Sequence, residues 1–169
     1  FQQNVAAEEV AALFFDANKD GFKDLYVVSG GNQFNDGSTQ LADKFYLNDG
    51  HGNFKDNTNA SMPSILKNKS CIAAADIDKD GDIDIFIGGL ADASKYGIPQ
   101  NSYLLLNNGK GVFALAAKDK IQLENIGMVT SSSFADLNKD GWDDLIITGE
   151  WMPLEIFMNH NGKFEKKSI

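Results

Sequence analysis

Oxygen-bearing side chains recur at a fixed spacing in three segments of this chain: DANKDGFKD from Asp16, DIDKDGDID from Asp76 and DLNKDGWDD from Asp136. Each segment has carboxylates or amides at positions 1, 3, 5 and 9, and glycine at position 6. In a tight loop such alternate side chains turn toward one centre, and the carbonyl at position 7 adds a further oxygen. Because calcium takes six to eight oxygens at about 2.3–2.6 Å, the spacing predicts three calcium-binding loops.

Each loop is predicted to supply five ligands, four through side chains and one through a backbone carbonyl. They are Asp16, Asn18, Asp20, Phe22 (carbonyl) and Asp24 in the first loop; Asp76, Asp78, Asp80, Asp82 (carbonyl) and Asp84 in the second; and Asp136, Asn138, Asp140, Trp142 (carbonyl) and Asp144 in the third. The second loop has four side-chain carboxylates where the others have three. Since calcium affinity rises with ligand charge, we expect the second loop to bind most tightly.

Two other interpretations of these loops are possible. An EF-hand begins in the same way, but it needs an acidic residue at position 12 and flanking helices. Position 12 here is Val27, Ile87 or Ile147, and the flanking segments are of β type, which excludes an EF-hand. Ordinary solvated turns use the same residue types, but three copies in one register disfavour them.

The elements that must position these loops form a repeat of 60 residues. Each loop is preceded by a short run of small or apolar residues and followed by a β-type run that glycine closes, such as LYVVSGG from Leu25. Further on come FYLNDGHGNF, LLLNNGKGVF and IFMNHNGKF, whose Asn-Gly steps suit tight hairpin turns. Each repeat therefore predicts a four-stranded antiparallel meander.

Tandem four-stranded units of this length predict an all-β fold built of β-propeller blades, over approximately residues 8–60, 68–118 and 128–169. A β-solenoid is the alternative, although its repeats are usually shorter. Three blades are too few to close a ring. We therefore expect part of a larger propeller, with the remaining blades supplied by the parent chain or by another subunit. The start, FQQNVAAEEV, lacks an initiator Met and a signal-peptide pattern, which indicates a trimmed or mature fragment.

Composition excludes several classes of partner. The chain carries 24 acidic and 15 basic residues, a net charge of −9, which argues against nucleic acid and anionic membrane surfaces. No apolar run is long enough to span a membrane. The single cysteine, Cys71, can form no intrachain disulfide, and its apolar setting predicts a small buried side chain.

The acidic loops and the trailing NDGHGNF, NNGKGVF and NHNGKF turns resemble FG-GAP/VCBS repeats, which build integrin α-subunit propellers and many secreted bacterial proteins. The third repeat, GMVTSSSFADLNKDGWDDLIITGEWMP, is especially similar to bacterial VCBS proteins with an ASPIC/UnbV-type domain. The resemblance implies structural Ca²⁺ at the fifteen loop positions and an extracellular, periplasmic or cell-surface location.

Strand alternation places the acidic loops and the Asn-Gly turns on one rim of the blades, and the connections after the second strands on the other. These connections vary in length, and variable loops on a rigid scaffold often carry recognition. The candidate ligand-binding residues are Asn32, Gln33, Phe34, Asn35, Tyr96 and Trp151. Solvated loops and blade packing are the competing explanation.

These features favour a secreted, calcium-stabilised binding or adhesion module for a protein or glycan, without catalysis in this chain. The alternative is part of a propeller enzyme that acts on polysaccharide or lipid, with its catalytic residues in other blades. A purely structural spacer is a third possibility. His51 and His160 both fall at Asn-Gly turns, where we expect exposed residues, and no catalytic triad emerges from the sequence.

Overall fold

The computed structural model describes residues 7–167 and contains twelve strands in three antiparallel sheets of four strands each. The first sheet holds β1 (Glu9–Phe15), β2 (Asp24–Ser29), β3 (Lys44–Asn48) and β4 (Phe54–Asp56). The second holds β5 (Lys69–Ala75), β6 (Asp84–Gly89), β7 (Tyr103–Asn107) and β8 (Phe113–Leu115). The third holds β9 (Met128–Ala135), β10 (Asp144–Glu150), β11 (Glu155–His160) and β12 (Lys163–Lys167).

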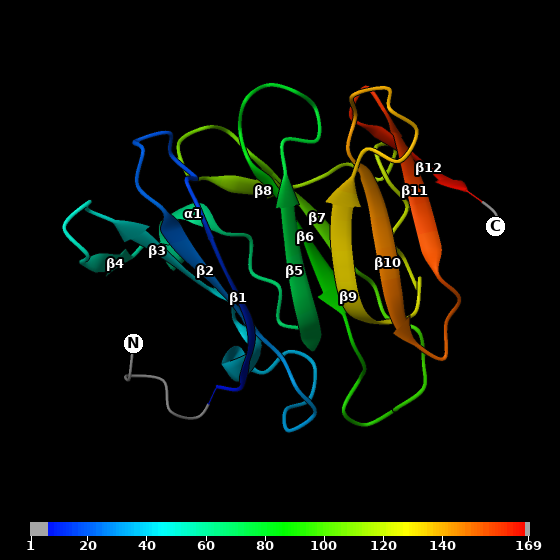
Figure 1. Cartoon of the computed structure of the whole chain (residues 1–169). Coiled ribbons are helices and arrows are strands. Elements are labelled where there is room, and N and C mark those ends of the chain that lie inside the picture. Colours follow the sequence, from blue (N-terminus) through cyan, green and yellow to red (C-terminus); the bar gives the residue numbers. More distant parts are fainter. Residues whose placement is uncertain (1–6, 168–169) are drawn as a thin grey trace.

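Each sheet is a meander in which sequential strands are neighbours, so the predicted all-β, blade-like architecture is confirmed. The three sheets stand side by side, and their first strands β1, β5 and β9 lie next to one another (Figure 1). The only helices in residues 7–167 are two short segments, a 3-10 turn at Thr39–Leu41 and α1 at Thr58–Ser61.

The repeat extends to irregular features of the strands. The pairing of the first two strands shifts register at Val10 in the first sheet, at Ser70 in the second and at Thr130 in the third. These positions are 60 residues apart, so the same bulge bends each first strand. Bulges increase the local twist of a strand, which suits sheets that pack face to face around a common axis.

Two apolar cores hold the sheets together, one at each joint, that is, at each interface between neighbouring sheets. Between the first and second sheets, Tyr26 and Phe45 pack with Ile85 and Ile87. Between the second and third sheets, Phe86 packs with residues of β10 and β11, including Leu145 and Phe157. The central strand β6 is buried along its whole length, because the second sheet is covered on both faces.

The connections fall on two rims (Figure 1). The acidic loops link β1 to β2, β5 to β6 and β9 to β10, and the Asn-Gly turns lie on the same rim. The β2–β3, β6–β7 and β10–β11 connections lie at the other ends of the strands.

Candidate metal centre

The acidic loops fold through hydrogen bonds from their own backbone to their aspartates. In the first loop, Asp16 accepts from the amides of Asp20 and Gly21 at 3.2 and 2.9 Å. Asp136 accepts from the corresponding amides of the third loop at 3.2 and 2.8 Å. The tight bend requires positive φ at position 6, which is glycine in every loop, with φ between 83° and 88°.

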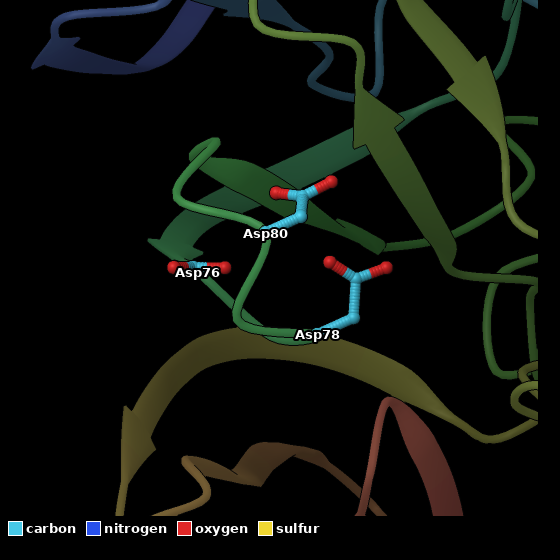
Figure 2. A group of neighbouring side chains, drawn as sticks. All are labelled: Asp76, Asp78 and Asp80. Carbon is cyan, nitrogen blue, oxygen red and sulfur yellow. The ribbon is translucent and has the colours of Figure 1, made fainter.

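In the second loop, Asp76, Asp78 and Asp80 form a cluster in which one carboxylate oxygen from each residue lies within 4.8 Å of the other two. Figure 2 shows the three carboxylates gathered along the loop between β5 and β6. Two oxygens that share one Ca²⁺ at 2.3–2.6 Å lie at most about 5 Å apart, so this spacing suits a shared ion.

Two buried oxygens of this cluster have no hydrogen-bond partner: Oδ1 of Asp76 and Oδ1 of Asp78. Buried carboxylate oxygens are normally satisfied, because leaving one without a partner costs free energy. A hard divalent cation would satisfy both oxygens and offset the repulsion between the carboxylates. The donor set of the second loop therefore fits calcium.

The first and third loops share a different arrangement, which follows from asparagine at position 3. The amide of Asn18 donates to Asp20 at 2.8 Å, and that of Asn138 donates to Asp140 at 2.8 Å. These hydrogen bonds hold each loop closed through neutral donors. A cation in either loop would take the place of the amide hydrogens beside the carboxylate.

The aspartate at position 9 makes contacts that the sequence did not reveal, and it lies outside the cluster of Asp76, Asp78 and Asp80. Asp24, Asp84 and Asp144 are almost fully buried, and each accepts one hydrogen bond from the position-2 amide and one from the turn asparagine of the same sheet. Burial, aided by repulsion from Asp78 and Asp80, raises the pKa of Asp84 to about 7. These aspartates therefore tie the acidic loop to the Asn-Gly turn within each blade.

Two lysines from outside the second loop partly neutralise it. Lys120 Nζ lies 3.0 Å from Oδ2 of Asp78, and Lys19, from the first loop, forms an ion pair with Asp82. The Asp82 carboxylate raises the pKa of Lys19. A cation held by Asp78 would compete with Lys120 for the same carboxylate.

The loops also connect neighbouring blades. The Asn107 amide donates to the Ala17 carbonyl at 2.8 Å, and the Asn159 amide donates to the Ile77 carbonyl at 2.8 Å. In both cases the turn asparagine of one blade donates to the position-2 carbonyl in the acidic loop of the preceding blade. The Asn-Gly pattern predicts these asparagines as turn formers only. Their occurrence at one site in all three repeats was the available signal.

A second contact recurs at both joints. The position-4 residue of each loop is a lysine with positive φ, and in the first and second loops it reaches the position-7 residue of the next loop. Lys19 meets Asp82, whereas the Lys79 ammonium lies 4.1 Å from the centre of the Trp142 ring, a cation–π contact. Position 7 therefore acts through its side chain at the joint, in addition to the backbone carbonyl predicted from sequence.

On the opposite rim, the structure brings together two of the six candidate ligand-binding residues. The Tyr96 and Trp151 rings are 5.7 Å apart, nearly perpendicular at 84°, and the Tyr96 hydroxyl donates to Glu150. Trp151 is 80% exposed and has a φ of 53°, which is rare for a bulky residue. Asn32, Gln33, Phe34 and Asn35 lie in the β2–β3 connection, where the Phe34 carbonyl accepts from Asn68 at 2.9 Å.

Near this rim the structure contains a buried ionic network that the sequence did not predict. Lys69 is fully buried, and its ammonium donates to the carbonyls of Leu41 and Ile65 at 2.7 and 2.8 Å and lies 3.1 Å from Asp43. Asp43 also accepts from the Tyr26 hydroxyl at 2.8 Å. The network joins the start of the second sheet to the first.

The remaining sequence candidates lie apart from the loops. His51 and His160 are exposed at their turns, as predicted. Cys71 is partly buried, and its Sγ lies 3.5 Å from the Ser132 hydroxyl. Within residues 7–167 the structure has no helix long and apolar enough to cross a membrane.

Comparison with known proteins identifies the repeat. A family model described as FG-GAP-like repeat matches residues 16–87 and 93–147, which include all three acidic loops. None of the curated proteins compared with the chain matches it. The matched residues cover well over half of the sequence, so the chain belongs to the family of FG-GAP-like repeat proteins.

Proposed function

We propose that this chain is a calcium-stabilised binding module, in which Ca²⁺ in the three acidic loops holds the blades and the opposite rim meets a partner. The observation that carries the calcium proposal is the convergence of Asp76, Asp78 and Asp80 around two buried carboxylate oxygens without partners. FG-GAP-like repeats are consistent with binding and adhesion modules, which supports the wider role.

In this proposal the chain's own residues do the positioning. The position-1 aspartates are held by backbone amides, and the position-9 aspartates are fixed by two amides each, so the carboxylates are oriented before an ion arrives. Bound Ca²⁺ would supply positive charge that links oxygens from the end of one strand and the start of the next. In the first and third loops, the Asn18 and Asn138 amides would turn their carbonyl oxygens to the ion.

Three Ca²⁺ ions would change the formal charge from −9 to −3. An ion present at a hundred times its dissociation constant stabilises the folded state by about 2.7 kcal/mol per site. For a site with a dissociation constant of about 10 µM, such concentrations are reached outside the cytoplasm, where calcium is millimolar. We therefore place the protein in an extracellular, periplasmic or cell-surface setting, in keeping with the extracellular proteins in which FG-GAP repeats are typically found.

A calcium titration tests the metal proposal. We expect calorimetric titration to give three sites per chain, and the melting temperature to rise with Ca²⁺ and much less with Mg²⁺, which demands stricter octahedral geometry. Asp76→Asn with Asp80→Asn should reduce the stoichiometry to two. Asp119→Asn with Glu165→Gln removes the same charge outside the loops and should retain three. A wild-type chain that binds no calcium at millimolar concentration would refute the proposal.

For the partner, a protein or a glycan, we propose the surface around Tyr96 and Trp151. The two rings come from the β6–β7 and β10–β11 connections, so two blades contribute to it. Beside it, a hollow of about 290 Å³ is lined by polar residues that include Asn68, Lys95 and Gln100. Exposed aromatic rings next to amide groups suit recognition, because they combine apolar area with directional hydrogen bonds.

The proposed binding role requires no catalytic group. Its test is a glycan array and a protein-interaction screen with wild type and Trp151→Ala, with Leu115→Ala, an exposed apolar residue of β8, as the control. We expect Trp151→Ala to abolish binding of the partner found and Leu115→Ala to preserve it. A partner that binds both variants equally would contradict the assignment of this surface.

We further propose that the three blades form part of a closed β-propeller, with the other blades supplied by a longer parent chain or by another subunit. The apolar faces at the two outer blades support this proposal. They correspond in the repeat to faces that pack at the internal joints.

A further inference from the structure

A polar hollow of about 290 Å³ lies on the rim opposite the acidic loops. Three segments line it: Lys67 and Asn68 before β5, the β6–β7 connection, and Asn125 before β9. The β6–β7 connection, at the lower end of the central sheet in Figure 1, also carries Tyr96. The hollow therefore adjoins the aromatic surface proposed above, and its walls belong to the second sheet and to the segment that enters the third.

Hydrogen bonds hold the walls of this hollow in place. On one side the Asn68 carbonyl accepts from the Leu90 amide at 3.1 Å. On the other side the Gln100 amide donates to the Gly127 carbonyl at 3.0 Å. Because these bonds tie the β6–β7 connection to the segments before β5 and β9, the hollow is formed before a ligand arrives, as ligand pockets usually are.

Asn68 gives the hollow an acceptor that the protein does not satisfy. The residue is only 2% exposed, and its Nδ2 donates to the Phe34 carbonyl at 2.9 Å, which fixes the orientation of the side-chain amide. The other amide atom, Oδ1, is buried and has no hydrogen-bond partner among residues 7–167. An unpaired buried oxygen costs free energy, so this position favours a ligand that brings a hydrogen-bond donor.

The charges around the hollow balance one another. Lys67 forms an ion pair with Asp36 at 2.8 Å. Hydrogen bonds from Ser94, aided by the charge of Lys95, lower the pKa of Asp92, so this carboxylate is ionised at neutral pH. A lining with both signs of charge and with amide groups suits an uncharged ligand rich in hydroxyl groups, because each hydroxyl both donates and accepts.

Trp151 offers a fixed aromatic ring next to the hollow. A β-carbon at Gly97 would lie 2.7 Å from this ring, so the ring lies directly on the backbone of the β6–β7 connection. The positive φ of Trp151 places it there although the residue is 80% exposed, and such strained residues cluster at ligand sites. A ring held on one side and open to solvent on the other suits the C–H face of a sugar.

We propose that the ligand of this rim is a neutral glycan, with one sugar in the hollow and a neighbouring sugar on the Trp151 ring. A hydroxyl group of the first sugar donates to Oδ1 of Asn68, and the Gln100 side chain contacts its other hydroxyl groups. The hollow is close to the lower end of the size range of ligand pockets, about 300–1,000 Å³, which suits a single sugar. The inference rests on the proposed binding surface and adds the chemical class of its ligand.

NMR titration of the isotope-labelled chain with neutral disaccharides tests the proposal. The probes are disaccharides of glucose, galactose, mannose and N-acetylglucosamine, at millimolar concentration. We expect at least one of them to shift the side-chain amide signals of Asn68 together with the indole signal of Trp151. A set of probes that leaves both signals unchanged would overturn the proposal.

Asn68→Leu removes the acceptor with little change in side-chain volume. We expect it to weaken binding of the disaccharide about tenfold or more. The matched control is Asn53→Leu, at an exposed asparagine in the β3–β4 turn on the other rim, which should bind as wild type does. Circular dichroism checks that the variants fold, and Gln100→Leu replaces Asn68→Leu if that variant unfolds. Equal affinity in Asn68→Leu and wild type would overturn the proposal.

Deoxy derivatives of the bound disaccharide identify the hydroxyl group that reaches Asn68. Removing that hydroxyl should cost about tenfold in affinity for wild type and have little effect in Asn68→Leu, because both changes remove the same hydrogen bond. If every deoxy derivative loses the same affinity in the two proteins, Asn68 does not contact the sugar and the proposal fails.

Two other probes test the class of ligand: a disaccharide with glucuronic acid, and butylammonium, which represents a lysine side chain of a protein partner. Tighter binding of either probe at Asn68 would overturn the assignment of a neutral glycan. A protein partner that requires Trp151 and tolerates Asn68→Leu would also overturn it, while the proposed surface would stand. The surface itself fails if Trp151→Ala binds every partner as wild type does, so the two failures are distinguishable.

Discussion

Lys69 illustrates how single residues hold this protein together. An ammonium group away from water is costly unless every proton finds an acceptor, and here two carbonyls and Asp43 supply them. Removing Lys69 leaves the Asp43 carboxylate buried without its cation, although the Tyr26 hydroxyl and the Ser29 amide still donate to it. We expect Lys69→Met to destabilise the fold by about 3–5 kcal/mol in urea unfolding.

Lys67→Met is the matched control. Lys67 lies two positions before Lys69 in the chain and forms an exposed ion pair with Asp36 at 2.8 Å. Exposed pairs contribute about 0–1 kcal/mol, so this variant should be close to wild type. Equal destabilisation by the two variants would show that the buried network has no special role.

The pH dependence of the same variant follows from Asp43. Burial raises the pKa of Asp43, while Lys69 opposes the rise, so Lys69→Met should raise it further. A carboxyl with a higher pKa in the folded state binds more protons there than in the unfolded state, so its contribution to stability increases as the pH falls. The stability difference between Lys69→Met and wild type should therefore shrink from pH 7 toward about pH 4. A difference that widens on acidification would contradict this assignment.

At the scale of elements, the Asn-Gly turn links blades as well as strands. Asn48 and Asn159 both accept a hydrogen bond from the glycine of their own turn, at 3.0 and 2.9 Å. Only Asn159 also donates to a neighbouring blade, at the Ile77 carbonyl. Comparing variants of Asn48 and Asn159 therefore distinguishes the contribution of the asparagine to its turn from its contribution to the contact between blades.

We expect Asn159→Ala to lower the free energy of unfolding by about 1–3 kcal/mol more than Asn48→Ala, because it leaves the buried Ile77 carbonyl without a donor. Urea unfolding at one calcium concentration measures the difference. Equal losses would mean that the asparagine acts only in its own turn.

At the scale of the whole molecule, the blades differ in how they are covered. The second sheet has a neighbour on each face, and all six residues of β6 are buried. The equivalent strands β2 and β10 are covered on one face, and Val27 and Ile146 are half-buried. In repeat proteins, stability comes from each unit and from its contacts with its neighbours, so the central blade should open last.

Hydrogen exchange tests this order. We expect the slowest amides in β6 and faster exchange in the outer strands β4 and β8, which have three residues each. Exchange from β2 that is slower than from β6 would contradict the nearest-neighbour account.

Much of the fold could be predicted because it is locally encoded. Three local features repeat every 60 residues: the acidic loops, the β-type runs and the Asn-Gly turns. Each of them depends on the backbone preferences of neighbouring residues. The blade-like sheets and the convergence of Asp76, Asp78 and Asp80 followed from that spacing. The expectation that the second loop binds calcium most tightly stays a prediction. In the structure Lys120 forms an ion pair with Asp78, and a bound cation would compete with it for that carboxylate.

The sequence by itself determined the repeat, the strands and the spacing of the acidic side chains in the loops, because each depends on residues close together in the chain. Only the tertiary structure decided which residues meet across blades: Asn107 with Ala17, Asn159 with Ile77, and Tyr96 with Trp151. It also decided that Lys69 is buried, since the acceptors that make burial tolerable come from other segments. Contacts between distant segments depend on how whole sheets pack, and no local pattern in the sequence specifies that packing.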